Sequence, residues 1–420
     1  MATNYWTGGA TPKKQVTTLT ITYNAGDTVG VKIGEAEVTT PCVTDADTTA
    51  ANLKAAIDAA KTNEQSYYQQ MTYGVSTNVI TVTAINPGFP FTITDTSTGS
   101  AAVTVSTTTA NKSPNDWADP DNWSLHAVPA ASDTVIFKDN AAPVWWNLNQ
   151  TSLALADIVI YRSYTGAIGL RWNAFMLPGG ASFANDAPEY RDHTLTVQYD
   201  NLYYGVDSLS AQATGPSRCN IQNSKAGAST SHITHVNSTG DGNFPSLQIA
   251  TINASGDILI SGVSGRVGIG TNATNGGGTS GDVAFQGTGS VEVDRHYQLT
   301  NLELTGGTHI VNAIDGSTVT KIDATDCNLT LQGDDWDITT LNARNSTVID
   351  RHFVSSGDEI GTVNLKSGTI DARGLGSAKS YGTVVMSENE ACNLIRDDDF
   401  SMTTLTLSGA TKLSTVAYSG

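Results

Sequence analysis

The chain has 420 residues and a formal net charge of −18, from 40 acidic and 22 basic side chains. Its length suffices for two or three ordinary domains or for one elongated repeat structure, and the negative charge argues against nucleic acid or an anionic membrane surface as partners. Charged residues are only 15% of the chain, and the 40 glycines, together with abundant Thr, Ser, Asn and Asp, favour strands and tight turns over helices.

The sequence carries no sign of membrane insertion or export. No stretch approaches the roughly 18 apolar residues of a membrane helix. The first residues, MATNYWTGG, lack the basic region and apolar run of a signal peptide, so we expect synthesis in a host cytoplasm. The cysteines form no CxxC pair, and we expect them to be small buried hydrophobes rather than metal ligands or disulfide partners: Cys42, Cys219, Cys327 and Cys392.

Residues 15–112 are predicted to form a compact α+β domain. Residues 16–24 and 29–38 alternate apolar and polar side chains with period two, which is typical of half-buried strands. Thr44 or Asp45 can cap a helix over residues 47–61, where apolar residues recur at helical spacing. Four further strand-like runs follow the helix: MTYGV, NVITVTA, FPFTITD and AAVTVST.

This segment resembles a small domain that recurs in tail and other virion proteins of phages. In that domain a hairpin precedes a helix of the type "d.taa.la.ai.a", and a hairpin of the type "itvtA…G.pf.i" follows it. The resemblance covers less than a quarter of the chain. The matching residues are Leu19-Thr20-Ile21, Gly26-Asp27, Thr48 to Leu53, Ala56-Ile57, Ile80 to Ala84 and Gly88 to Phe91.

Two short phrases flank this domain. Residues 5–10, YWTGGA, and residues 115–137, NDWADPDNWSLHAVPAASDTVIF, together resemble the opening of β-solenoid modules in phage structural proteins and bacterial surface proteins. In those modules a "YW.GG" phrase directly precedes a "W…NWS…P…D.V.f" phrase. Because residues 15–112 separate the two phrases here, we expect that domain to be an insertion near the base of a solenoid.

The first coil of a parallel β-helix has open edges and an open core that must be covered. Trp6, Trp117 and Trp123 are large enough to close that end. We therefore predict that these side chains pack together, with residues 1–14 as the first part of a solenoid cap and residues 113–150 as the second part. The alternative is that these tryptophans belong to the ordinary core of a separate β domain.

Residues 151–420 are predicted to form a parallel β-solenoid (β-helix) of roughly 20-residue coils, because each short strand of a coil sends alternate side chains inward. The clearest apolar i, i+2 pairs begin 20, 19, 22, 21 and 21 residues apart, at Leu302, Ile322, Leu341, Val363, Val384 and Leu405. Less regular pairs begin upstream at Val135, Ile158, Leu195, Ile252 and Val283. The predicted class is mainly β with the α+β insertion; antiparallel sandwiches are the alternative.

Aromatic residues preceded by an acid stand just before several of these pairs: Tyr297, Trp336, Phe353 and Phe400. Stacked coils would align them in an aromatic row beside acidic turns. Two of the runs, DRHY at 294–297 and DRHF at 350–353, are nearly identical. Their side chains are candidate glycan or subunit contacts, although two copies of a repeat unit explain the likeness more simply, without any function: Arg295, His296, Tyr297, Arg351, His352 and Phe353.

The sequence predicts no catalytic residue, metal site or cofactor. Phage tailspikes often cleave polysaccharide with paired carboxylates, for which Asp334, Asp335, Asp337 and Asp397 to Asp399 are the places to look, but structural turns explain these acids more simply. His232 and His235 would point to opposite faces of a strand, which disfavours a shared metal ion. The glycine-rich run at 268–281 lacks the strand–loop–helix context of a phosphate site.

The resemblances imply a protein of the virion exterior of a tailed phage. One expectation is a capsid decoration (cement) protein that binds the major capsid protein. The other is a tail fibre or tailspike that contacts tail proteins and host-surface polysaccharide, with or without glycan-cleaving activity. A bacterial adhesin is disfavoured by the missing signal peptide. Because isolated solenoids and spikes usually gain stability by trimerising, the expected oligomer is a homotrimer.

Overall fold

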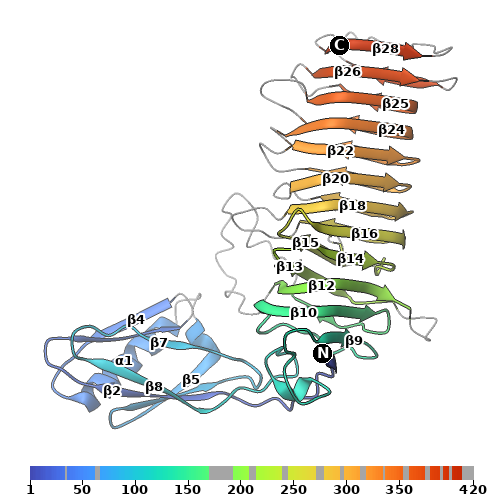
Figure 1. Ribbon diagram of the computed structural model, residues 1–420. Helices are drawn as coiled ribbons and strands as arrows, with labels where there is room; N and C mark the ends of the chain where they lie inside the picture. Colours follow the sequence, from blue (N-terminus) through green and yellow to red (C-terminus); the bar gives the residue numbers. More distant parts are fainter. Residues whose placement is uncertain are drawn as a thin grey trace.

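The computed structural model of the chain describes residues 1–33, 36–61, 67–169, 193–207, 214–238, 245–270, 279–293, 298–312, 318–333, 336–352, 359–373, 379–387, 391–396 and 400–408. Within them the chain is mainly β, with a parallel β-solenoid over residues 134–407 and a small N-terminal α+β domain, as predicted. Figure 1 shows the solenoid as a stack that rises from the N-terminal end to β28 (Ser401–Ser408), with the α+β domain beside its base.

Within the described residues the α+β domain combines α1 with two antiparallel sheets. Its elements are β2 (Val16–Thr22), β3 (Thr28–Ile33), β4 (Ala36–Pro41), α1 (Ala46–Lys61), the 3-10 helix η1 (Tyr67–Gln70), β5 (Met71–Ser76), β6 (Val79–Ala84), β7 (Ile93–Asp95) and β8 (Ala102–Thr109). The sheet orders are β5-β6-β2-β8 and β4-β3-β7. Helix α1 buries Leu53 and Ile57 in a core that shares no residue with the solenoid core.

The predicted helix start is present. Asp45 Oδ1 accepts a hydrogen bond from Thr48 N at 2.7 Å, and this bond holds the pKa of Asp45 below its ordinary value. The prediction of one strand over residues 29–38 is wrong, because β3 and β4 form an antiparallel hairpin in which Ile33 stands opposite Ala36. An alternating pattern can continue across a tight reversal, so periodicity alone does not reveal the turn.

A first sheet of parallel strands extends along the whole solenoid. Each strand pairs with the next in the order β1 (Thr3–Tyr5), β9 (Thr134–Phe137), β10 (Asn149–Tyr161), β12 (Leu195–Val206), β14 (Ser229–Ile233), β16 (Gly256–Val263), β18 (Thr279–Gly287), β20 (Gln298–Thr305), β22 (Thr318–Thr325), β24 (Asp337–Asp350), β25 (Ile360–Asp371), β26 (Ser380–Ser387) and β28. The pairing of β1 with β9 makes the α+β domain an insertion between two neighbouring strands.

A second parallel sheet forms another side of the coils. Its strands are β11 (Ala167–Ile168), β13 (Arg218–Asn223), β15 (Leu247–Thr251), β17 (Arg266–Ile269), β19 (Ser290–Val293), β21 (Thr308–Val311), β23 (Asn328–Leu331), the later halves of β24 and β25, and β27 (Cys392–Ile395). Strands β24 and β25 are long enough to run from the first sheet into the second.

The predicted repeat is confirmed in the first sheet. The leading residues of the predicted pairs stand opposite one another from Val283 to Leu405. Alternation turns both members of a pair inward, so that Leu302 and Leu304 are 0% and 1% exposed. In the last described strand Leu405 and Leu407 are 38% and 46% exposed, because no further described strand stacks on β28.

Two of the upstream pairs do not fit the predicted register. Leu195 points inward, but it pairs with Ile221 in the second sheet. Ile252 is 46% exposed and lies outside the strands, and the inward pair of that coil is Ile258 and Ile260. The sequence Ile-Asn-Ala, residues 252–254, alternates like a strand, but the strand that carries the inward pair, β16, begins at Gly256.

Each of several coils turns a corner through a residue of positive φ, four positions after its leading apolar residue. The φ values are 70° for Gly262, 73° for Gly306, 52° for Asp326, 48° for Asn345 and 64° for Ser367. Gly, Asn and Asp tolerate this left-handed conformation better than other residues do. The constant position of the corner residue therefore helps to fix where each coil leaves the first sheet.

An Asn345→Ala variant is expected to lose about 1–2 kcal/mol of unfolding free energy, because alanine adopts the left-handed conformation at that cost. Asn345→Gly serves as the matched control, since both variants lose the hydrogen bond from Ser367 Oγ to Asn345 Oδ1 while only alanine is strained. Urea denaturation of the two variants measures the difference. Equal stability of the alanine and glycine variants would contradict a conformational role for the corner.

Candidate functional site

The three predicted cap tryptophans lie together at the base of the solenoid. The ring centroids of Trp6 and Trp123 are 5.1 Å apart and those of Trp117 and Trp123 are 4.8 Å apart, both in edge-to-face geometry. Phe137 lies within 6.4 Å of all three rings. Their exposures are 2% for Trp6 and 0% for the other two, and all belong to the solenoid core. Edge-to-face packing of this kind stabilises beyond the area that it buries.

Backbone and side-chain hydrogen bonds join the two halves of the cap. Trp6 N donates to Ile136 O at 2.9 Å, and Trp123 Nε1 donates to Trp117 O at 2.8 Å. Asn122, at the end of the 3-10 helix η2 (Pro120–Asn122), is fully buried; its Oδ1 accepts from Ala10 N at 2.9 Å and its Nδ2 donates to Ser113 O at 2.6 Å. Its role was not predicted, although it stands in the NWS part of the pattern.

Asp133 fastens the first strand to the base. Its carboxylate accepts hydrogen bonds from Ala130 N at 3.0 Å and from Ala2 N at 2.7 Å, and these two bonds hold its pKa below the ordinary value. The aspartate of the "D.VIF" phrase therefore ties the chain before β1 to the chain before β9.

The two DRH runs differ in how much of each lies within the described residues. Residues 294–297, with Arg295, His296 and Tyr297, and Phe353 lie outside the described residues. Arg351 is partly exposed, and its guanidinium donates to Asp371 Oδ2 at 2.9 Å and to Asp371 O at 3.0 Å. His352, one of the candidate glycan or subunit contacts, is 0% exposed and lies inside the coil. Because the His352 side chain packs inside the coil, a ligand on the surface of the described residues does not reach it.

His352 belongs to a buried charge cluster that consists of Asp350, His352, Glu359, Lys379 and Tyr381. Asp350 Oδ1 lies 2.5 Å from His352 Nδ1 and accepts from Lys379 Nζ at 2.9 Å, while Asp350 Oδ2 accepts from Tyr381 OH at 2.6 Å. Asp350 is 0% and Lys379 is 4% exposed. Lys379 Nζ also donates to His352 O. The Asp350 carboxylate thus joins the end of the β24 coil to the start of the β26 coil, and Glu359 Oε2 accepts a hydrogen bond from Ser380 N.

The pKa values of the buried charge cluster follow from burial and contacts. Burial raises the pKa of Asp350, but the contacts with His352, Lys379 and Tyr381 outweigh it and bring the value to about 2. Burial is also the main cause that raises the pKa of Glu359. Asp350 is therefore a carboxylate at neutral pH that balances the charge of Lys379 inside the coil.

The remaining candidate residues named from the sequence either contact other side chains or lie outside the described residues. Among the described aromatics of the proposed row, Trp336 packs on His352 at 4.7 Å and Phe400 packs on Tyr381 at 4.9 Å. Asp337 begins β24, whereas Asp334, Asp335 and Asp397 to Asp399 lie outside the described residues. His232 stacks on Tyr203, and His235 hydrogen-bonds Thr214 O. In the described ranges no three His, Cys, Asp or Glu side chains are placed to hold a metal ion, and all four cysteines are buried and free.

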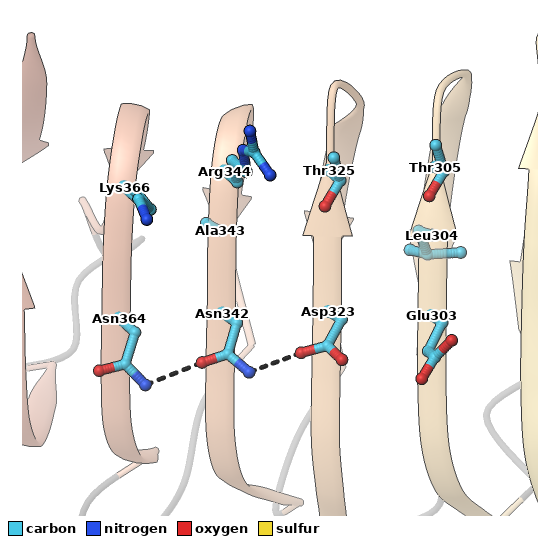
Figure 2. Close-up of a pocket in the computed structure, with 10 residues that line it drawn as sticks. All are labelled: Glu303, Leu304, Thr305, Asp323, Thr325, Asn342, Ala343, Arg344, Asn364 and Lys366. Atoms are coloured by element: carbon cyan, nitrogen blue, oxygen red, sulfur yellow. Dashed lines mark hydrogen bonds between the residues drawn. The ribbon is translucent and has the colours of Figure 1, made fainter. Parts of the chain in front are cut away.

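A shallow groove of about 440 Å³ crosses the outer face of the first sheet over β20, β22, β24 and β25. Figure 2 shows two rows of side chains on these strands. Strand pairing places the first row in register as Glu303, Asp323, Asn342 and Asn364, and the second as Thr305, Thr325, Arg344 and Lys366. The rows are two residues apart, so both point outward between the inward residues of the repeat.

The polar groups of the groove change from acidic to basic along the solenoid. Asn364 Nδ2 donates to Asn342 Oδ1 at 2.8 Å, and Asn342 Nδ2 donates to Asp323 Oδ1 at 2.5 Å. Lys321 Nζ lies 2.8 Å from Asp323 Oδ2 beside the groove. The Arg344 guanidinium is exposed and makes no hydrogen bond or ion pair with any described residue. It therefore has donors available for an anionic group of a ligand.

The groove was not predicted, although the sequence holds a signal for it. Once the repeat is aligned, the residue between the two apolar members and the residue after them define the two rows, as in Leu-Asn-Ala-Arg from Leu341 to Arg344. Amide and carboxylate oxygens accept hydrogen bonds from hydroxyl groups, and a guanidinium binds carboxylates in a fork geometry. The arrangement suits a polyhydroxylated ligand that carries an acidic group.

These features define a parallel β-solenoid protein with a sealed base, an inserted α+β domain and a polar groove on its outer sheet. Within the residues that the structure describes, no helix is long and apolar enough to cross a membrane. The scan against protein-family models and the comparisons with curated proteins and with solved structures find no match for this chain.

Proposed function

We propose that the chain is a structural protein of the virion exterior of a tailed phage, and specifically a capsid decoration protein that binds the major capsid protein as a homotrimer. The observation that carries the proposal is the architecture of the base. The first strand, the tryptophan cap and the α+β domain all lie at one end of the solenoid (Figure 1). This gives the molecule a domain suited to attachment at one end and a rigid projection at the other.

The position of the protein in intact particles tests this function. Purified virions are imaged by electron cryo-microscopy, and the copy number is measured by quantitative mass spectrometry against the major capsid protein. A decoration protein is expected on the head, in a copy number that matches a class of capsomer sites. Density confined to the tail, or a copy number that matches the tail fibres, would overturn the decoration function and favour the second candidate.

The second candidate is a tail fibre or spike that binds a host-surface glycan, and the polar groove favours it. The first row of the groove offers amide and carboxylate acceptors for sugar hydroxyls, and Arg344 and Lys366 stand side by side in the second row, on β24 and β25. A glycan with an acidic sugar would fit both features. Cleavage of the glycan is a separate question, which release of oligosaccharide from host polysaccharide would answer.

An Arg344→Ser variant is expected to bind such a polysaccharide about tenfold or more weakly, because a charge-assisted hydrogen bond is lost. Arg266→Ser is the matched control: Arg266 is partly exposed and lies on the second sheet, where it pairs with Glu292. Binding of acidic host polysaccharide is measured by isothermal titration calorimetry. If both variants bind like the wild-type protein, the groove is not the glycan site.

A further inference from the structure

The buried charge cluster holds a lysine amine against a carboxylate in a place that water does not reach. Lys379 Nζ lies 2.9 Å from Asp350 Oδ1, and the two side chains are 4% and 0% exposed. The ion pair of Lys225 with Asp200 has a similar separation of 2.6 Å, but its side chains are 28% and 60% exposed. Removing two charges from water is strongly unfavourable, so the buried pair is in a far less favourable state than the exposed one.

The groups around the buried pair contact both oxygens of the carboxylate and wall it off. His352 Nδ1 lies 2.5 Å from Asp350 Oδ1, and Tyr381 OH donates to Asp350 Oδ2 at 2.6 Å. The Trp336 ring packs on His352 and the Phe400 ring packs on Tyr381, with centroid distances of 4.7 Å and 4.9 Å. The site therefore combines an amine, a carboxyl carbon and a different polar group on each carboxylate oxygen.

We propose that Lys379 and Asp350 are a modification site, at which the two side chains condense to an isopeptide bond within the chain. The lone pair of Lys379 Nζ forms a bond to Asp350 Cγ, and the bond from Cγ to Oδ1 breaks. Oδ1 leaves as water, and the product is a neutral amide. The step needs no oxidant, reductant or other co-reactant.

The proton transfers of this condensation follow the contacts of Asp350 Oδ1. One proton passes from Lys379 Nζ to Oδ1 across their hydrogen bond, which leaves an uncharged amine able to attack. As the tetrahedral intermediate forms, Tyr381 OH stabilises the negative charge on Oδ2. His352 Nδ1 then gives Oδ1 its second proton and is restored by the second proton that Nζ loses. The amide nitrogen keeps one proton, and the departing water carries two.

Two physical effects favour the amide over the ion pair. The fold already holds the reacting groups in contact, which replaces an encounter in solution by a step within one molecule. The amide also removes two charges from a site without water. Burial raises the pKa of Asp350, but its contacts bring the value to about 2. The reactive pair of amine and acid is therefore a minor state, so freshly folded protein holds the ion pair and the bond accumulates slowly.

The bond would close the coils covalently near the upper end of the solenoid. Asp350 is the last residue of β24, and Lys379 directly precedes β26, 29 residues further along the chain. The segment between them contains β25, so the bond would prevent this coil from separating from its neighbours. The inference does not rest on the proposed function, because the chemistry needs only the folded chain.

Intact mass spectrometry of the full-length protein tests the bond directly. During incubation at neutral pH, the wild-type protein is expected to lose the mass of one water molecule. A proteolytic digest is expected to yield a branched peptide that joins Asp350 to Lys379. Wild-type protein that keeps its full mass throughout would overturn the proposal. A loss of water that maps to any other residue would overturn it as well.

A lysine-to-arginine exchange separates the covalent bond from the ion pair. Lys379→Arg keeps a positive charge beside Asp350 but removes the amine, so it is expected to retain its full mass, with circular dichroism to verify folding. The exposed pair of Lys225 and Asp200 is a control inside every wild-type molecule and is expected to give no branched peptide. Loss of water by the arginine variant at the wild-type rate would overturn the proposal, as would equal cross-linking of the exposed pair.

Discussion

An Asp350→Asn variant is expected to lose about 3–5 kcal/mol of unfolding free energy, because it leaves Lys379 charged and buried without its counterion. Lys379 is 4% exposed, and Asp350 Oδ1 lies 2.9 Å from its Nζ. The asparagine also loses the full strength of the hydrogen bond from Tyr381 OH, which is now made to a carboxylate. Chemical denaturation at neutral pH measures the loss.

Two further variants separate a buried charge from an ordinary ion pair. The double variant Asp350→Asn, Lys379→Met is expected to recover part of the loss, since no unpaired charge then remains inside the coil. Glu292→Gln breaks the partly exposed pair with Arg266 and is expected to cost at most about 1 kcal/mol. If Asp350→Asn is no more destabilising than Glu292→Gln, the buried charge cluster does not stabilise these coils.

The same carboxylate predicts a pH dependence. The pKa of Asp350 is about 2 in the folded protein and about 3.9 in an unfolded chain, so its contribution is present above about pH 4 and is lost as the pH falls toward 2. The lost contribution is about 2–3 kcal/mol. Glu359 acts in the opposite direction because burial raises its pKa. The quantity to follow is therefore the stability difference between wild type and Asp350→Asn, which is expected to shrink between pH 4 and pH 2.

A Trp123→Ala variant is expected to lose about 3–5 kcal/mol of unfolding free energy from the solenoid, through lost burial and the cavity that remains. Trp123 is 0% exposed, packs edge to face on both other cap tryptophans and stands in a β-bridge with Trp6. Hydrogen exchange is expected to accelerate in β1 and β9. The α+β domain has a separate core and is expected to keep its protection.

Phenylalanine substitutions supply the control for the cap. Trp123→Phe loses the hydrogen bond from Nε1 to Trp117 O, whereas Trp117 Nε1 has no acceptor among the described residues. Trp117→Phe is therefore expected to be less destabilising than Trp123→Phe by about 1 kcal/mol. A Trp123→Ala protein that unfolds like the wild type, with unchanged exchange in β1, would contradict a role for the cap in closing the base.

Those parts of the molecule that repeat, or that match a pattern, were predictable from the sequence. Pairs such as Leu302 and Leu304 recur at a nearly constant interval because every coil has the same inside, and the split phrase placed Trp6 with Trp123 across the insertion. The register was harder to predict among the lower coils, where the interval between apolar pairs is longer and less regular and where the exposed Ile252 stands in an alternating run.

The buried charge cluster and the groove could not be read from local patterns. Lys379 and Asp350 are 29 residues apart in the chain, and neither stands at a position where the repeat requires a charge. The groove depends on residues of four neighbouring coils, whose chemistry becomes a site only when the strand register is known. An alternating pattern likewise conceals the reversal between β3 and β4, because the turn there does not interrupt it.

The split base also affects how the chain reaches its fold. Ala2 and Asp133 are joined across 131 residues, and a closure of that length carries a large entropy cost. Lys13 and Lys112 form a β-bridge where the chain enters and leaves the α+β domain. Once that domain has folded, it shortens the loop to about a quarter, which lowers the closure cost by about 1 kcal/mol. If the inserted domain folds first, the joining of β1 to β9 therefore becomes less costly in entropy.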